Sequence, residues 1–137
     1  MPFHPWRALR RMPAIDVWWG HLPSGAVGAT DGEVIYLDSR QSQAQRRSTL
    51  THELVHVERG HRGCQPEIIE RDVQREAARR LIPMPLLLDK LSWTEDLAEL
   101  ASECWVDRPT LMARLDSLTE AERAQIVDLY ERTERGA

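Results

Sequence analysis

Two histidines four residues apart are the strongest chemical signal in this sequence. They belong to the run His52-Glu53-Leu54-Val55-His56, which has the pattern H-E-x-x-H. Residues four apart lie on one face of a helix, one turn apart, so both imidazoles can reach a single metal ion. Glu53 projects beside them, where it can take a proton from a water molecule made acidic by zinc. The pattern predicts His52 and His56 as metal ligands and Glu53 as a catalytic base.

Two histidines leave a catalytic zinc ion one protein ligand short. His61 does not complete the pattern H-E-x-x-H-x-x-G-x-x-H, because the glycine and the last histidine of that pattern would fall on Arg59 and Arg62. Cys64, eight residues beyond His56, could compete for the ion. The alternative interpretation is that His52 and His56 are two exposed histidines on a solvated helix face.

The next segment offers acidic residues for the third ligand. Its apolar residues recur every four positions and predict a helix that ends before Pro83. At 100° per residue, Glu70 lies about 40° from the centre of this apolar stripe, closer than Glu67 or Asp72. A carboxylate directed at a core must be paired or bound to metal, so we expect Glu70 as the third ligand. Glu76 is the reserve candidate.

Neighbouring residues suggest how the site is supported. Gln74, one turn after Glu70, is placed to hydrogen-bond a histidine ligand. Tyr36 and His21 are candidates for stabilising an oxyanion, since each offers a hydrogen-bond donor. The structural alternative for Glu70 is a surface carboxylate in a charged helix.

The elements that carry these residues form three stretches. Residues 1–40 predict a short basic helix and strands near 15–18, 26–30 and 34–37, with a hairpin turn at Asp31-Gly32. Residues 41–82 hold the two metal-site helices, and residues 83–137 form a mostly helical C-terminal part. Capping signals place helix starts near 93, 108 and 120. We expect an α+β fold in which a small antiparallel sheet packs on the H-E-x-x-H helix.

Composition limits the class of protein. The chain has 137 residues, 42% of them hydrophobic, which suits a single domain over residues 1–137. We expect neither a membrane span nor a secretory signal. Two cysteines cannot form a disulfide framework, so we expect a reduced, cytoplasmic protein. The net charge is −4, and arginines alternate with acidic residues, so we do not expect direct binding to nucleic acid or to a membrane.

The two metal-site helices resemble those of the ImmA/IrrE metallo-endopeptidases. The resemblance lies in residues 50–56 and in residues 70–83, which are similar to a family helix of the approximate form E-x-x-A-[ND]-x-F-A-x-x-L-[LM]-x-P. Aligned on the final proline, Glu70 falls on the third zinc ligand of that family. Gln74, Glu76 and Arg80 depart from the pattern, where the family has Asn or Asp, an aromatic residue and leucine. In all, the resemblance covers about residues 30–115, including 34–37 as an edge strand.

This resemblance implies a zincin-like fold, one Zn²⁺ per chain and a bacterial or phage endopeptidase. It implies a protein substrate, a helix-turn-helix repressor whose cleavage or loss regulates transcription, because relatives are often encoded beside such a repressor. We expect the strand at 34–37 to bind the substrate peptide by edge pairing. The competing class is a regulator that binds DNA or a repressor without proteolysis.

Residues 97–115 bear on that competing class because they have the pattern of a helix-turn-helix. Their second helix would carry Arg108, Thr110 and Arg114 toward a DNA groove. Acidic residues in and before the segment would repel phosphate, however, so packing behind the catalytic unit is the favoured interpretation.

Overall fold

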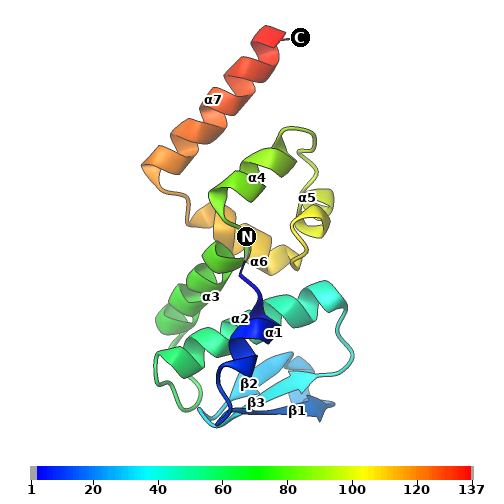
Figure 1. The fold of residues 1–137 in the computed structure, drawn as a ribbon, viewed down its shortest axis with the longest axis vertical. Helices are drawn as coiled ribbons and strands as arrows, with labels where there is room; N and C mark the ends of the chain where they lie inside the picture. The colour runs from blue at the N-terminus through cyan, green and yellow to red at the C-terminus, as the bar shows by residue number, and fades with distance from the viewer. Residues whose placement is uncertain (1–2, 137) are drawn as a thin grey trace.

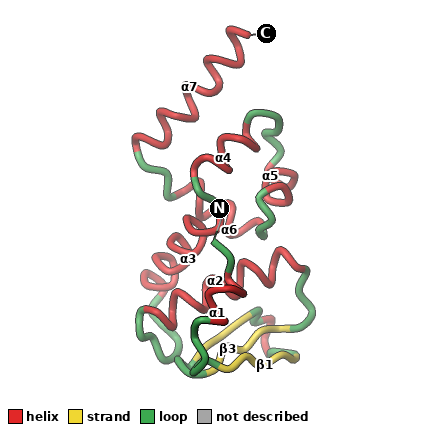
Figure 2. Tube along the Cα trace, in the orientation of Figure 1, coloured by secondary structure: helices red, strands yellow, loops and turns green. Residues whose placement is uncertain are grey.

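The computed structural model describes residues 3–136 and has helices stacked above a small sheet (Figures 1 and 2). Seven α-helices lie within these residues: α1 (Pro5–Arg10), α2 (Gln43–Glu58), α3 (Glu67–Leu81), α4 (Met84–Leu91), α5 (Leu97–Glu103), α6 (Arg108–Asp116) and α7 (Glu120–Gly136). The strands are β1 (Asp16–Gly20), β2 (Gly28–Thr30) and β3 (Val34–Asp38), with a short 3-10 helix at Pro23–Gly25. The expected α+β class with a mostly helical C-terminal half is confirmed.

The sheet is mixed, and the expectation of a wholly antiparallel sheet was wrong. Its strand order is β1-β3-β2, with β2 antiparallel and β1 parallel to β3. The hairpin turn at Gly32, where φ is +94°, places β2 on one edge of β3. Only the other edge remains for β1, and residues 21–27 carry the chain back to start β2. Residues 34–37 therefore belong to the central strand, and β2 is an edge strand.

Helix α2 lies across one face of the sheet (Figure 1). It begins with a capping box in which the Ser42 hydroxyl accepts from the Gln45 N–H and the Gln45 side chain accepts from the Ser42 N–H. Ile35 and Leu37 of β3 pack against Leu50 and Leu54 of α2, and all four are fully buried. This small core fixes the roll of α2, so the opposite side of its last two turns faces α3.

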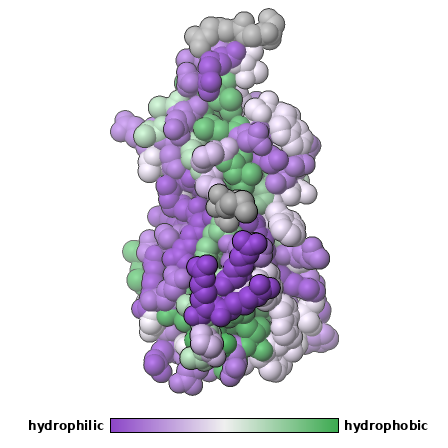
Figure 3. All heavy atoms as spheres, viewed as in Figure 1, coloured by the Kyte–Doolittle hydropathy of each residue, from purple (hydrophilic) through white to green (hydrophobic). Residues whose placement is uncertain are grey.

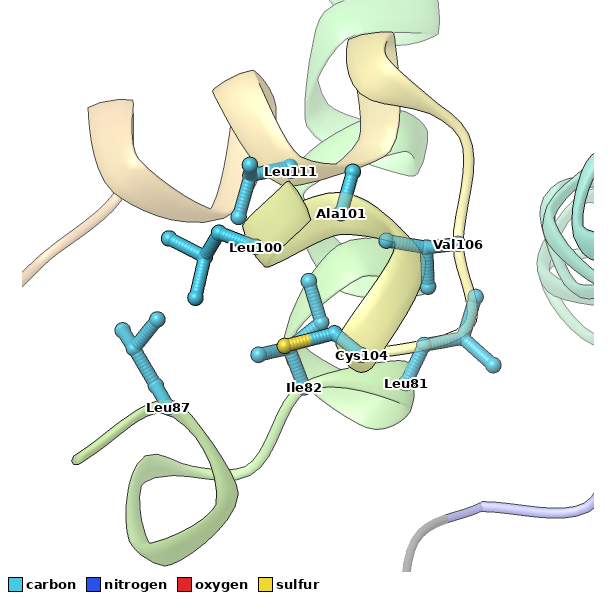
Figure 4. Close-up of a cluster of buried hydrophobic side chains, with 8 residues drawn as sticks. All are labelled: Leu81, Ile82, Leu87, Leu100, Ala101, Cys104, Val106 and Leu111. Carbon is cyan, nitrogen blue, oxygen red and sulfur yellow. The ribbon is translucent and has the colours of Figure 1, made fainter. Parts of the chain in front are cut away.

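The C-terminal half has its own core, drawn in Figure 4. Eight buried residues from the end of α3 to α6 form it: Leu81, Ile82, Leu87, Leu100, Ala101, Cys104, Val106 and Leu111. The outer face seen in Figure 3 is largely hydrophilic, with apolar areas between the polar side chains. None of the helices within residues 3–136 is long and apolar enough to cross a membrane.

Helix starts in this half test the capping signals. The starts expected near 108 and 120 are confirmed by the Asp107 cap of α6 and by the reciprocal Thr119–Glu122 capping box of α7. The start expected near 93 was wrong. Ser92 instead ends α4, where its hydroxyl donates to the Asp89 carbonyl, and Asp96 caps α5 through the Glu99 N–H.

Candidate metal centre

The structure brings His52, His56 and Glu70 together between α2 and α3. Glu70 Oε1 lies 3.0 Å from His52 Nε2 and 2.9 Å from His56 Nε2. One potential ligand atom from each of the three residues lies within 4.8 Å of the others. His56 is buried and Glu70 is partly exposed. Two imidazole nitrogens and one carboxylate oxygen form the donor set of a three-ligand catalytic zinc site.

The Gln74 side chain links this cluster to α6. Gln74 Oε1 lies 2.8 Å from His52 Nδ1, as the sequence predicted, and Gln74 Nε2 lies 3.4 Å from Thr110 Oγ1. The Thr110 hydroxyl donates to the Asp107 carboxylate, and Gln74 Nε2 can only donate, so Thr110 Oγ1 is the acceptor for Gln74. The direction of every bond is thereby fixed, and His52 Nδ1–H is the donor to Gln74.

This direction determines what faces Glu70. With its proton on Nδ1, a neutral His52 ring presents the bare lone pair of Nε2 to Glu70 Oε1, only 3.0 Å away. Two acceptors so close repel each other unless a positive charge, a proton or a metal ion, lies between them. The residues present therefore fit a cation bound between α2 and α3.

The charges of the cluster favour metal-binding forms. Burial raises the pKa of Glu70, but contacts with His56 and His52 outweigh it and lower that pKa below its ordinary value. Burial chiefly lowers the pKa of His56, which keeps its ring neutral. An ionised carboxylate and a neutral imidazole are the forms that bind zinc.

Glu53 lies beside the cluster, buried beneath β2 with 6% of its surface exposed. Among residues 3–136 no donor hydrogen-bonds its carboxylate. Burial, with a smaller contribution from the Glu70 charge, raises the pKa of Glu53 to about 7, although His52 opposes this. A Cβ at Gly28 would collide with Thr49 Cγ2 and lie 3.4 Å from Glu53 Oε1, so β2 approaches this closely only with glycine there. The arrangement suits a general base at neutral pH.

A cleft of about 670 Å³ opens over these residues. Its walls include β2, the cluster of three, Glu53, the loop residues Gly63 and Cys64, and the start of α6. Tyr36 and His21 do not line it, and the Tyr36 hydroxyl lies near Asp31 on the sheet. The structure therefore does not bring these two candidates for oxyanion stabilisation to the site.

The other acidic and thiol candidates lie outside the cluster of three. On α3, Glu67 pairs with Arg71, Asp72 with Arg59 and Glu76 with Arg80. Cys64 is exposed and lines the cleft without joining the cluster.

Of the three residues in 97–115 that a helix-turn-helix would direct at DNA, two are buried and one lines the cleft. Thr110 is 2% and Arg114 1% exposed, so neither can reach a groove, while Arg108 lines the cleft. Thr110 contacts Gln74 and Asp107 contacts Thr110, and the sequence did not identify this link to the cluster, since the contact with Gln74 joins positions 36 apart. His61 was considered only as a ligand. Its ring nitrogen Nδ1 instead lies 2.8 Å from His56 Nδ1.

One family model matches the chain. It describes the IrrE N-terminal-like domain, a peptidase family, and it matches residues 17–123. No curated protein and no solved structure matches the chain significantly. The matched residues include β2, β3 and all of β1 except its first residue. They also include both helices of the candidate metal centre and the start of α6, which supports Gln74.

Proposed function

The chain belongs to the IrrE N-terminal-like family of peptidases, and on that basis we propose that it is a zinc-dependent endopeptidase. In this proposal His52, His56 and Glu70 hold one Zn²⁺ and Glu53 is the general base. The observation that carries it is the convergence of two imidazole nitrogens on Glu70 Oε1 in a cleft that Glu53 also lines. The residues fit the metal, because the fixed proton on His52 Nδ1 calls for a cation between the rings and Glu70.

The proposed chemistry divides between the ion and Glu53. When bound, zinc would supply Lewis acidity that polarises the scissile carbonyl and makes water a stronger acid. Glu53 would take the proton from the attacking water on its carboxylate and deliver it to the departing amine. In the metal-free site burial raises the pKa of Glu53 to about 7, and its carboxylate has no hydrogen-bond donor among residues 3–136, so it is free to take up that proton and pass it on.

Peptide binding is proposed at β2. The sequence interpretation assigned edge pairing to residues 34–37, but these lie in the central strand, whereas Gly28–Thr30 form the edge that lines the cleft. The unpaired side of an edge strand can hydrogen-bond an extended peptide. A substrate strand there would pass directly over Glu53 and the cluster of three.

The substrate we propose is a helix-turn-helix repressor, on the strength of the resemblance to the ImmA/IrrE peptidases. A repressor substrate would place the protein in the cytoplasm, in keeping with its two free cysteines. We propose further that residues 1–137 work as one domain. The contact from Gln74 to Thr110 supports this, because it joins the metal centre to the C-terminal half.

Metal analysis is the first test of the zinc site. The purified chain, loaded with zinc and desalted, is expected to hold close to one ion, and Glu70→Ala much less. Glu76→Ala is the matched control, since it removes a carboxylate from the same helix but outside the cluster. A wild-type chain that holds no zinc would overturn the proposal.

A second experiment separates proteolysis from binding alone. The chain is mixed with a candidate helix-turn-helix repressor, and products are followed by mass spectrometry and by repressor–operator binding. Wild type is expected to cut the repressor, while Glu53→Gln leaves it intact and on its operator. Relief of repression by Glu53→Gln without cleavage would favour a binding regulator.

A further inference from the structure

Helix α2 ends at Glu58, two residues after His56, in a specific turn. The C-terminal cap is Arg59, and Gly60 follows with φ of +74°, a left-handed conformation that favours glycine. The Gly60 N–H donates to the Val57 carbonyl, and the His61 N–H donates to the His56 carbonyl, each at 3.0 Å. These two bonds define a Schellman motif.

The motif determines which side chain meets His56. In this motif the second residue after the cap folds back against the residue three positions before the cap, and the two side chains commonly make an apolar contact. Here the two residues are His61 and His56, with ring centroids 5.1 Å apart and Nδ1 atoms 2.8 Å apart. The turn also lies against the β2–β3 hairpin, since a Cβ at Gly32 would be 3.5 Å from the His61 carbonyl oxygen. The His61 backbone is therefore held from two sides.

Two neutral imidazoles joined through Nδ1 share one proton, so one ring donates and the other accepts. His56 Nε2 faces Glu70, and a lone pair there requires the His56 proton on Nδ1. We infer that His61 is a positioning residue for His56, accepting its Nδ1–H and aiming the Nε2 lone pair at the metal site. This inference rests on the proposed function, because the metal makes the lone pair necessary.

The other imidazole has an equivalent support from a different source. His52 Nδ1–H donates to Gln74, which comes from α3 and is held by Thr110. His56 takes its partner from the end of its own helix. Each imidazole thus has one outer partner at 2.8 Å, and such partners fix ring orientation and raise metal affinity.

A matched pair of substitutions isolates the acceptor. His61→Leu keeps an apolar side chain for the helix-ending contact but cannot accept a hydrogen bond. The Asn side chain of His61→Asn branches at Cγ as that of Leu does, and it offers a carbonyl oxygen where the histidine ring has Nδ1. Zinc affinity is measured by competition with a chromophoric chelator at one pH, and the unfolding of each metal-free variant is followed in parallel.

We expect His61→Leu to bind zinc about ten- to a hundredfold more weakly than wild type, and His61→Asn to recover most of the loss. His21→Leu, which removes an exposed histidine away from the cleft, should bind as wild type does. Equal affinity of His61→Leu and wild type would overturn the inference, and so would a loss that His61→Asn fails to recover. A wild-type chain that binds no zinc would overturn the proposed function as well, so the two failures are distinguishable.

Nuclear magnetic resonance of the zinc-bound wild type gives a readout that needs no variant. A long-range proton–nitrogen spectrum of the imidazoles is expected to show His56 protonated on Nδ1 and His61 protonated on Nε2. A His61 ring protonated on Nδ1 would leave no acceptor for His56 and would overturn the inference.

Discussion

Glu53 and Glu122 are shielded carboxylates in opposite halves of the molecule, and their surroundings differ in kind. The carboxylate of Glu122, in α7, accepts hydrogen bonds of 2.7–3.3 Å from the guanidinium groups of Arg114 and Arg79 and one from the Thr119 N–H. Glu53 of α2 has no protein donor among residues 3–136. Hydrogen bonding from Arg114 is the main cause that lowers the pKa of Glu122, whereas burial raises the pKa of Glu53 to about 7.

The difference shows what each half of the molecule has to do. The paired carboxylate joins three helices, because Arg79 comes from α3, Arg114 from α6 and Glu122 from α7. The unpaired carboxylate stabilises nothing that the structure shows, and burying it ionised costs folding free energy. A buried, unpaired carboxylate that lines a cleft has the surroundings expected of a functional group.

The largest expected effect comes from removing the ionisable group at Glu53. Glu53→Gln should lower peptidase activity by about 10²- to 10⁴-fold, because it removes the proposed general base, while the zinc content should stay near that of wild type. Activity is measured on the cleaved protein substrate and zinc by elemental analysis. Glu58→Gln, on the same helix but outside the cleft, should retain activity. Substrate cleavage by Glu53→Gln at the wild-type rate would remove Glu53 from this role.

Removing the charge of Glu122 should lower the stability of the fold and leave the metal site unchanged. Glu122→Gln leaves the buried Arg114 guanidinium without its charge partner and is expected to lower the free energy of unfolding by about 2 to 4 kcal/mol. Zinc affinity should change little, since the cluster of three lies elsewhere. Denaturant unfolding measures the loss, and Glu131→Gln, exposed on the same helix, is the control. A loss no larger than that of the control would mean that the ion pairs contribute nothing net.

In the metal-free protein, Glu122 and Glu53 should change the free energy of unfolding in opposite directions as the pH rises. A lowered pKa means that Glu122 stabilises the fold above its ordinary pKa of 4.5 and loses this effect as the pH falls below it. A raised pKa means that wild type loses stability relative to Glu53→Gln as the pH rises from 4.5 through about 7, by up to about 3 kcal/mol. Unfolding of wild type and both variants between pH 3 and 8 measures this. Differences that stay constant with pH would contradict both assignments.

Local signals predicted much of the fold. The Thr119–Glu122 box and the Asp107 cap each depend on residues within one turn, and both helix starts were correct. Ser92 failed because Asp96 provides a competing cap a few residues later. The parallel pairing of β1 could not be predicted by alternation of apolar residues, because it depends on which edge of β3 the hairpin leaves open.

The candidate site divides along the same line. The four-residue spacing on one helix predicted His52 and His56 as metal ligands. The position of Glu70 relative to the apolar stripe favoured it over the other acidic residues of α3. His61 follows a local signal as well, since a glycine just beyond a helix end is typical of the turn that places it. The support of Gln74 by Thr110 is different. It depends on how α6 packs against α3, which no pattern within either helix reports.

The smallest expected effect tests that long-range support. Thr110→Val keeps the shape of the side chain and the Asp107 cap on the Thr110 backbone N–H, but removes the hydroxyl that orients Gln74. Because the lost contact is long, at 3.4 Å, and acts on the metal only through Gln74 and His52, zinc affinity should fall only about two- to fivefold. Chelator competition measures this, with Thr133→Val on the exposed face of α7 as the control. A loss as large as that of Gln74→Leu would mean that Thr110 alone holds Gln74 in place. No loss at all would mean that His52 fixes the Gln74 amide without help from α6.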